Sequence, residues 1–575
     1  MHAKLFWESD IFKTVEAACY SLLKQKDDAL LEDVENAVEM IRNAQHPDGY
    51  INSYFTVTGL SDRWTNLRDL HELYCLGHLV EACVAYETLT NSGKLLEPVT
   101  KAIGHVDSVF GAEPGKLRGY PGHQEIEIGL LRLFEMTRNP LFFNVAKYFL
   151  MERGRRDENN EIYFDLEAHR RGGDLNSNMF FEMKAWYRFP RDYAYHQADC
   201  TLVEADELKG HAVRAMYYMI AATDLYRLDG NERVKEAIDR LWRDMVDKKM
   251  YVTGGLGAIR QWEGFGPSYF LYDTEKQGTC YTETCATFAM ILWCQRLLRL
   301  NLDSEYGDVM EIGLYNGFLG AIGLDGTTFY YENPLRTYTG EAKIRTPWLD
   351  CACCPPNVAK LLGLLGTIIY SYTSKYVAIH LYLESSFVVP NMDVVVSQTT
   401  GMPWSGQVNI TVKGTTGLCL RIPGWAQHYT CSLEAREERG YLYIEPAPNI
   451  DLKLTFTMQA RKVYTNPKTN KDEVCIMRGP LVYCIEDVDN DVDVDNILLL
   501  DEPLSDIEPQ QIAGVDSVVQ IRAVGKEILD DKPSLYRFEP WKHSSEKKCL
   551  TYVPFFLRAN RGGKGGMRVW SKYVL

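Results

Sequence analysis

The 575-residue sequence predicts a multidomain protein, with an α-helical N-terminal region followed by a β-rich C-terminal region. From residue 11 to about residue 372, apolar residues recur at i, i+3, i+4 and i+7, with polar or Gly/Pro breaks between the runs. After Tyr370, short alternating segments rich in β-branched and aromatic residues replace this pattern. The chain is also several times longer than a typical domain of roughly 100–150 residues, so more than one domain is expected.

The helical region contains five predicted helix–turn–helix units and one further helix. The units cover residues 11–44, 67–110, 123–152, 208–249 and 283–322, and the last helix follows Pro355-Pro356 because Pro suits a first helical turn. Repeated helix pairs form an open solenoid or a closed toroid. The long loops 154–209 and 251–282 favour a toroid with one working face, an (α/α)6 barrel. Eleven helices leave six pairs one helix short, and the missing helix belongs before Phe6.

The β region contains predicted strands in segments 376–390, 407–412, 418–422 and 441–444, separated by Gly, Asn and Pro turns. Roughly 200 residues of such structure suit one or two sandwiches. The predicted domains are a barrel over residues 1–372, lacking its first helix, a β-sandwich over 373–472 and a second β-sandwich over 473–575.

Composition and charge exclude several functional classes. Hydrophobic residues make up 46% and charged residues 24%, as in ordinary globular proteins rather than disordered chains. The net charge of −16 repels phosphate backbones and anionic membranes, so we expect no nucleic-acid and no membrane partner. The chain contains fifteen cysteines, which is an odd number, and its N-terminal residues do not resemble a signal peptide. We therefore expect a reducing, cytoplasmic compartment, where clustered cysteines indicate metal binding or catalysis more than disulfides.

Two cysteine motifs begin predicted helices. Cys351-Ala-Cys353-Cys354-Pro-Pro precedes the last helix, and Glu283-Thr-Cys285 opens the ninth. In a toroid the N-termini of equivalent helices meet at one rim, which would gather three thiols and one carboxylate. Helix N-termini and a cation both favour thiolate, and three Cys with one Glu form a sensible tetrahedral zinc set. The alternative is that these are buried, inert core cysteines.

Polar residues fall at the same predicted rim. His123 opens the fifth helix and His211 the seventh, while His71 and His78 share one face of the third helix with Tyr74 between them. A single histidine is more often structural, but several at matching positions of different units indicate a site. Loop 251–282 adds acidic candidates.

Several motifs together resemble the bacterial β-L-arabinofuranosidase family of glycoside hydrolases, which use a zinc-bound cysteine as nucleophile. The motifs are Cys353-Cys354-Pro-Pro-Asn357, Glu283-Thr-Cys285, Gly77-His-Leu-Val-Glu-Ala82, Gly210-His-Ala-Val-Arg-Ala215, Tyr331-Glu-Asn-Pro-Leu335, Leu420-Arg-Ile-Pro-Gly-Trp425 and Arg478-Gly-Pro-Leu-Val-Tyr483. The resemblance covers nearly the whole chain and implies an (α/α)6 barrel followed by two β-sandwiches.

The resemblance also implies roles for single residues. Cys353 is the implied nucleophile and zinc ligand, with Cys354, Cys285 and Glu283 as the other ligands. His78, His123, His211 and Tyr331 match residues that line the family's sugar pocket, and Cys351 matches a cysteine that is not a ligand. Glu263, upstream of Tyr272-Asp273, is the best match to the general acid/base, and Glu275 competes for that role.

The sequence therefore predicts a retaining exo-glycosidase that releases non-reducing-end β-L-arabinofuranose from a small oligosaccharide or glycoside, as a possible homodimer. One alternative is the same mechanism on another furanoside or on a branched acidic sugar, whose carboxylate would meet basic residues of loop 154–209 such as Arg155, Arg170 and Arg188. Another is a non-catalytic, zinc-stabilised carbohydrate-binding protein.

Overall fold

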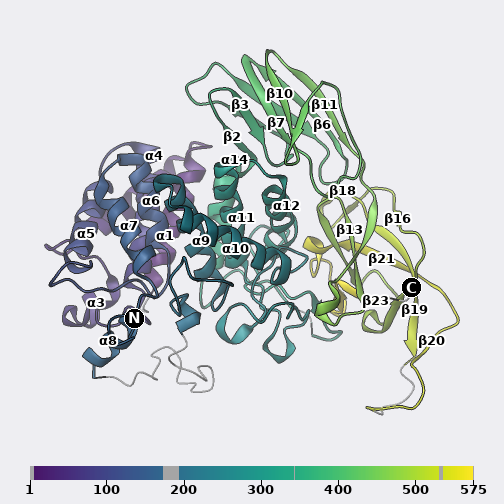
Figure 1. The fold of residues 1–575 in the computed structure, drawn as a ribbon. Coiled ribbons are helices and arrows are strands. Elements are labelled where there is room, and N and C mark those ends of the chain that lie inside the picture. Colours follow the sequence, from purple (N-terminus) through teal and green to yellow (C-terminus); the bar gives the residue numbers. More distant parts are fainter. Residues whose placement is uncertain (1–5, 173–192, 342, 530–534, 574–575) are drawn as a thin grey trace. The chain divides into compact units, whose positions relative to one another are not determined.

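The computed structural model describes residues 6–172, 193–341, 343–529 and 535–573. The N-terminal part is helical and the C-terminal part is β-rich, as predicted (Figure 1). The residues form two compact units. The first contains Met1–Lys248, Gln261–Gly266 and Asp350–Leu364, and the second contains Lys249–Arg260, Pro267–Leu349 and Leu365–Leu575. Each unit is described by itself.

The helices of the first unit include the members of the predicted pairs and two short helices, α3 (Ser53–Thr58) and α8 (Tyr163–Arg170), that were not predicted; α8 lies within the predicted loop 154–209. The others are α1 (Trp7–Leu22), α2 (Asp28–Asn43), α4 (Glu72–Thr90), α5 (Leu96–Val109), α6 (Ile126–Thr137), α7 (Pro140–Glu152), α9 (Ala212–Asp229), α10 (Glu232–Lys248) and the first part of α14 (Cys354–Ile369). Local signals set the breaks: the Asn139 side chain accepts the Leu141 N–H ahead of α7, and Gly230 ends α9 in the left-handed region.

Two kinds of helix build this unit. Helix α1 packs against α4, α4 against α6, and α6 against α9, and each of these has a partner helix next in sequence. In α4 every residue from Glu72 to Glu87 is buried, whereas α10 buries a single apolar stripe that includes Val234, Leu241 and Met245. Helices buried all round form an inner row, and helices with one apolar stripe cover it. The inner row brings the first turns of α4, α6 and α9 into one region.

The second unit begins with the pair α11 (Thr284–Leu300) and α12 (Ser304–Ile312), which continues through a π-helical turn, Gly313–Phe318, into the short α13 (Leu319–Ala321). A first pair of sheets follows. One contains β2 (Tyr370–Tyr372), β3 (Tyr376–Ile379), β7 (Thr415–Arg421), β10 (Tyr441–Pro448) and β9 (Arg436–Glu438), and the other contains β4 (Ser385–Val388), β5 (Val395–Thr400), β6 (Gln407–Lys413), β11 (Asp451–Phe456) and β8 (Tyr429–Cys431).

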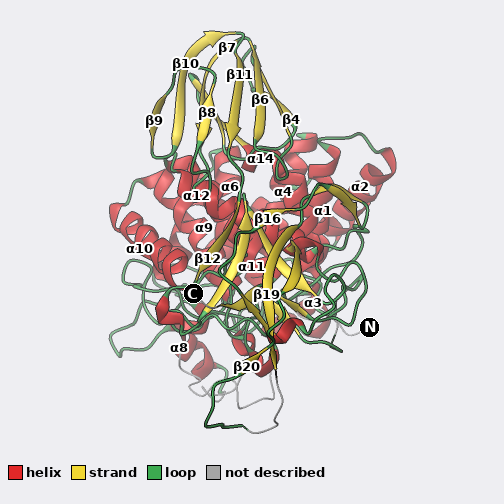
Figure 2. Cartoon of the chain, turned by 90° about the vertical axis from the view of Figure 1, so that its right-hand side faces the viewer, coloured by secondary structure: helices red, strands yellow, loops and turns green. Residues whose placement is uncertain are grey.

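These two sheets form the predicted first sandwich (Figure 2). Strand β6 buries every second residue, and the Tyr382 and Phe456 rings meet between the sheets with centroids 5.3 Å apart. All strand pairs are antiparallel except β3 with β7. Alternating burial of this kind is typical of sheets that cover a shared core with one face each.

The prediction of a second sandwich is wrong in its architecture. Most of the remaining strands form one eleven-stranded sheet of β1 (Arg336–Thr337), β22 (Met567–Arg568), β14 (Leu481–Glu486), β21 (Lys548–Pro554), β19 (Ile521–Leu529), β15 (Ile497–Leu499), β23 (Trp570–Tyr573), β13 (Glu473–Arg478), β12 (Ala460–Tyr464), β16 (Ser505–Asp506) and β20 (Lys542–His543), while β17 (Gln510–Ile512) and β18 (Val515–Val518) pair separately. An additional pairing of β13 with β14 joins the two ends of the path β14-β21-β19-β15-β23-β13. These strands therefore close into a small barrel, filled by residues such as Ile476, Tyr483 and Tyr552.

Among the described residues, no helix combines the length and the hydropathy that a membrane span requires.

Candidate active site

The start of α9 is paired with a short segment of the loop that precedes α11. Residue His211 forms an antiparallel bridge with Gly264, the Ala212 N–H donates to the Glu263 carbonyl at 3.0 Å, and the Phe265 N–H donates to the Gly210 carbonyl at 2.9 Å. A Cβ atom on Gly264 would lie 1.9 Å from the Gly210 oxygen, so only glycine allows this approach. Glu263 itself has a positive φ of 51°. The pairing fixes the Glu263 backbone against the first turn of α9.

The Glu263 side chain meets His211. One carboxylate oxygen lies 2.9 Å from His211 Nε2, and His211 Nδ1 accepts the Arg214 N–H at 3.4 Å. With Nδ1 as an acceptor, Nε2 carries the proton and donates to Glu263. Burial lowers the pKa of His211 from its usual value, and the Glu263 carboxylate partly opposes this. The Glu263 side chain remains 38% exposed, so its carboxyl group is held beside a neutral imidazole and is partly accessible.

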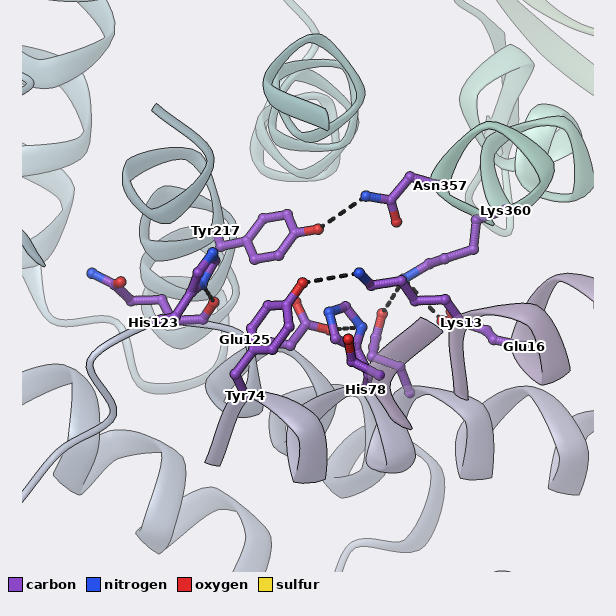
Figure 3. Close-up of polar contacts among 12 residues, drawn as sticks. Lys13, Glu16, Tyr74, His78, His123, Glu125, Tyr217, Asn357 and Lys360 are labelled. Atoms are coloured by element: carbon purple, nitrogen blue, oxygen red, sulfur yellow. Dashed lines mark hydrogen bonds and ion pairs between the residues drawn. The ribbon is translucent and has the colours of Figure 1, made fainter. Parts of the chain in front are cut away.

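His78 lies at the centre of α4 and is fully buried. Its Nδ1 lies 2.9 Å from a Glu125 carboxylate oxygen, and its ring meets Tyr74 edge-on at 4.5 Å (Figure 3). Burial, reinforced by Lys13 and Lys360, holds the pKa of His78 well below its usual value, and burial also raises the pKa of Glu125. His78 is therefore a neutral ring that lies beside the Glu125 carboxyl group.

His123 lies beside the same tyrosine. Its ring centroid is 4.4 Å from that of Tyr74 and 5.6 Å from that of His211, while its Nδ1 lies 2.7 Å from the Gln124 carbonyl. Lys13 Nζ donates to the Tyr74 hydroxyl at 2.9 Å (Figure 3). The first unit thus brings together His78, His123 and His211, three of the four predicted pocket residues.

The cysteine motif opens α14. The Sγ atoms of Cys353 and Cys354 lie 3.8 Å apart, with Cys354 fully buried and Cys353 partly exposed. A hydrogen bond to Cys353 and burial raise the pKa of the Cys351 thiol, and the Glu263 charge acts in the same direction. One turn later, Asn357 Nδ2 donates to the Tyr217 hydroxyl at 3.4 Å (Figure 3). The start of α14 therefore belongs to the same region as Glu263.

In the second unit, Glu283 and Cys285 occupy the first turn of α11 and are both buried. Glu283 forms an antiparallel bridge with Glu332, and the Thr284 N–H donates to the Tyr331 carbonyl at 3.0 Å. The backbone of Tyr331, the fourth predicted pocket residue, is therefore hydrogen-bonded directly to the segment that contains the predicted metal ligands. Its ring lies 6.0 Å from that of Tyr281.

The four predicted metal ligands form one group. Each of Glu283, Cys285, Cys353 and Cys354 offers one ligand atom, and these atoms all lie within 4.8 Å of one another. One ligand atom from each of His211, Glu263 and Glu283 also lies within 4.8 Å of the other two. The structure thus contains a largely buried Cys/Glu cluster that can bind a metal ion, as expected from the two motifs.

The competing acid/base candidate, Glu275, forms an ion pair. The Glu275 carboxylate is bound by the Lys343 ammonium, whose other contact is Glu332 at 3.5 Å. Of the basic residues expected to meet an acidic sugar, Arg155 pairs with Glu152, and the Arg170 guanidinium lies over the Tyr163 ring at 5.6 Å. Arg188 lies outside the described residues.

Sequence reasoning missed three residues that hold this site together. Glu125 positions His78, Tyr217 binds Asn357, and Lys13 is completely buried against Tyr74. The position of Glu125, just before α6 and two residues after His123, was the available signal. An acidic residue at a helix start is ordinarily read as solvated, which hides its role.

Family models match three consecutive parts of the chain. Residues 1–366 match the catalytic domain of β-L-arabinofuranosidases of glycoside hydrolase family 127, residues 376–458 match the middle domain, and residues 460–572 match the C-terminal domain of that family.

Single relatives agree over almost the full length. The non-reducing end β-L-arabinofuranosidase of Bifidobacterium longum subsp. longum is 31% identical over 608 aligned positions, covering 99% of this chain and 90% of that protein. A crystal structure of a family 127 β-L-arabinofuranosidase from Geobacillus stearothermophilus T6 has a TM-score of 0.90 at 34% identity, covering 100% of this chain and 91% of that one. A second family 127 β-arabinofuranosidase structure has a TM-score of 0.85 at 30% identity, covering 99% and 88%. The chain therefore belongs to glycoside hydrolase family 127.

Proposed function

We propose that this protein is a retaining exo-glycosidase that releases β-L-arabinofuranose from the non-reducing end of a small oligosaccharide or glycoside. Two full-length relatives above 30% identity carry the name β-L-arabinofuranosidase, and one of them is named for the non-reducing end. The observation that carries the proposal is the cluster of three cysteines and one glutamate within 4.8 Å. Retaining hydrolysis needs a nucleophile and a proton donor at the anomeric carbon, and Cys353 and Glu263 are our assignments for them.

Glu283, Cys285, Cys353 and Cys354 would hold a zinc ion. Tetrahedral zinc with Zn–S bonds near 2.3 Å requires sulfur atoms about 3.8 Å apart, and the Cys353 and Cys354 Sγ atoms lie 3.8 Å apart. Three thiol groups and a carboxylate also suit zinc better than magnesium or calcium, which prefer oxygen ligands. When bound, zinc supplies the positive charge that keeps a cysteine as thiolate at neutral pH.

Exposure selects the nucleophile among the three cysteines. Cys354 and Cys285 are buried, whereas Cys353 is partly exposed. Only Cys353 can therefore reach a sugar while its sulfur remains in the ligand group. Its Sγ attacks the anomeric carbon, the bond to the leaving oxygen breaks, and the arabinosyl group becomes covalently attached to the sulfur.

Glu263 is our general acid and base. Its carboxyl group protonates the leaving oxygen in the first step, and its carboxylate then removes a proton from the water that cleaves the covalent intermediate. The His211 Nε2–H at 2.9 Å and the pairing of residues 263–265 with 210–212 position it. His211 stays neutral because burial lowers its pKa, so it orients the carboxylate without adding a full charge.

His78, His123, His211 and Tyr331 would bind the sugar hydroxyls. A neutral imidazole offers one donor and one acceptor, a combination suited to hydroxyl groups. The His78 ring is held close to Glu125, with 2.9 Å between its Nδ1 and a carboxyl oxygen. Aromatic faces such as that of Tyr74, 4.4 Å from His123, suit the apolar face of a sugar.

We also propose that the helical region is an (α/α)6 barrel within residues 1–372. Support comes from the inner row α1, α4, α6 and α9 and from α14, whose Lys360 lies 2.8 Å from Glu16 of α1. The middle domain would cover residues 373–472 except for β12, which pairs with β13 and so belongs with the C-terminal domain that contains residues 473–575.

A cytoplasmic location is part of the proposal, because no disulfide joins any of the fifteen cysteines, all of which lie in the described part of the chain. Homodimer formation remains a prediction, for which light scattering in solution is the measurement.

A substrate panel tests the function. The purified protein is incubated with p-nitrophenyl β-L-arabinofuranoside, the α anomer, other furanosides and a uronide, with and without a chelator. Turnover of the β-L-arabinofuranoside that is lost in Cys353→Ser supports the proposal. Preferred turnover of another furanoside or of the uronide would instead support the same chemistry on a different sugar. Stoichiometric zinc without turnover of any substrate would indicate a carbohydrate-binding protein.

A further inference from the structure

A second cavity lies in the β-rich unit, and no residue assigned above to catalysis, metal binding or sugar binding lines it. Its volume is about 230 Å³, and its lining includes Tyr330, Lys343, Glu486 and Arg558 together with the glycine-rich segment 562–565. Cavities for drug-sized ligands measure roughly 300–1,000 Å³, so this one suits a smaller molecule, of the size of a phosphate ion or a monosaccharide.

Two buried arginines dominate the chemistry of this cavity. Arg558, which lines it, is 2% exposed, and Arg345 next to it is 7% exposed. Arg558 donates to the Phe555 carbonyl and to Asn333 Oδ1, and Arg345 donates to the carbonyls of Arg558 and Gly320. All of these acceptors are neutral. Within the described residues, neither guanidinium forms an ion pair with a carboxylate.

Burying two such cations together is unfavourable. Carbonyl acceptors satisfy N–H groups without neutralising their charge, and a buried charge needs a counterion to offset its lost hydration. Both guanidiniums lie over the Tyr330 ring, at 4.3 Å for Arg345 and 5.2 Å for Arg558. Burial and repulsion from Arg345 lower the pKa of Arg558 to about 9, in agreement with an uncompensated positive field.

The other charged groups around the cavity are already paired. The Glu486 carboxylate accepts the Ala559 N–H at 2.8 Å and lies 2.5 Å from the Arg561 guanidinium. Lys343 is bound to Glu275. The positive charge that remains to be matched is therefore that of the two arginines. Arg558 has five N–H donors, and its two hydrogen bonds to protein acceptors leave donors for a ligand.

The cavity wall also leaves room for a ligand. Gly562, Gly563 and Gly565 have φ values of 81°, 91° and 94°, which other residues rarely adopt. A Cβ atom on Gly562 would meet no atom within 4 Å, so this part of the wall faces open space. Glycine backbone beside a buried guanidinium is a combination that recurs where proteins bind anions.

We propose that this cavity binds a small oxyanion, a carboxylate or phosphate group, with Arg558 as its principal donor. The site is linked to the ligand segment of α11, because Asn333, the acceptor of Arg558, also donates to the Thr282 carbonyl and to Thr284 Oγ1. The proposal does not depend on the glycosidase activity.

Isothermal titration calorimetry with the full chain tests it, using inorganic phosphate, sodium glucuronate and, as an uncharged control, arabinose. Ile344 lines the cavity and is 77% exposed, so changing it leaves the fold intact. We expect one-to-one anion binding that Ile344→Glu weakens at least tenfold by charge repulsion and that the matched Ile344→Gln changes less than twofold. Arg558→Gln abolishes binding, and the Ile344 pair decides the question if that variant does not fold.

Saturable binding of phosphate alone identifies a phosphate site, and tighter binding of glucuronate identifies a site for an acidic sugar. Failure of both anions to bind the unmodified protein would overturn the proposal, as would equal affinity in Ile344→Glu and Ile344→Gln.

Discussion

Replacing Gly264 by alanine tests how the acid/base is positioned. The new Cβ atom would lie 1.9 Å from the Gly210 oxygen, whereas ordinary contacts begin at 3.4 Å. The difference, 3.4 minus 1.9, means that the segment must retreat by about 1.5 Å. The Gly210 oxygen is a backbone atom that accepts the Phe265 N–H, so it cannot turn aside as a side chain would.

The displacement of Gly264 also moves Glu263, the residue before it in the chain. Its carboxylate now lies 2.9 Å from His211 Nε2, and a displacement of this size breaks that contact. Misplacing a catalytic group by 1 Å costs on the order of 100-fold in rate, equivalent to about 2.7 kcal/mol of activation free energy. Because Glu263 acts mainly in the transition state, we expect kcat to fall about 100-fold while KM changes little.

Initial rates on p-nitrophenyl β-L-arabinofuranoside measure the effect, with thermal unfolding as the check on folding. Gly104→Ala in α5 is the matched control, because a Cβ atom there meets nothing within 4 Å and Ala favours a helix by about 1 kcal/mol over Gly. A Gly264→Ala protein that unfolds normally and keeps a kcat within threefold of the original would refute the reasoning.

Further predictions concern the proton donor, the histidine partner, the metal and acid stability. Glu263→Gln lowers kcat by about 10²–10⁴-fold, since the amide cannot transfer a proton. Glu125→Leu lowers kcat/KM about tenfold because His78 Nδ1 loses its partner at 2.9 Å, whereas Glu125→Gln, which mimics the protonated acid, stays near the original value. Chelation removes activity and lowers the melting temperature, and zinc restores both. Burial lowers the pKa of His380 to about 3. Below pH 6.5 this histidine therefore binds a proton in the unfolded chain but not in the folded chain. Stability is therefore lost as the pH falls, and His380→Gln reduces this slope by about 1.4 kcal/mol per pH unit.

For each of these predictions, one experimental result would contradict it. Full activity of Glu263→Gln would remove Glu263 from the mechanism, and equal activity of the two Glu125 variants would reduce its partnership with His78 to packing. Activity that survives exhaustive chelation would exclude a required metal. An unchanged dependence of denaturant unfolding on pH in His380→Gln would mean that this histidine does not titrate on unfolding.

Local patterns predicted most of the fold because their physical causes are local. Helix pairs are marked by period and by breaks such as Asn139-Pro140 and Gly230, where caps end or start a helix. The small barrel was not predictable in this way. Its closure depends on pairings between distant segments, such as β15 with β23 and β13 with β14, and strands buried on both faces, such as β14, show no alternation.

The site shows the same division. The two cysteine motifs mark themselves by residue type at a helix start, and the structure places their ligand atoms within 4.8 Å. By contrast, Glu125 resembles any acidic residue until the packing of α4 and α6 brings it to His78. The ion pair of Glu275 with Lys343 likewise depends on a contact that no local sequence pattern predicts.

The central claim is that Cys353 attacks the sugar. Glu263→Gln protein is incubated with p-nitrophenyl β-L-arabinofuranoside, quenched in acid, digested and analysed by peptide mass spectrometry. The variant lacks the base that activates water for the second step, so the activated leaving group allows the covalent intermediate to accumulate. We predict one pentosyl group on the peptide that contains Cys353, and none in the Cys353→Ser, Glu263→Gln double variant. A pentosyl group on a carboxylate elsewhere, or one that persists in the double variant, would contradict the account.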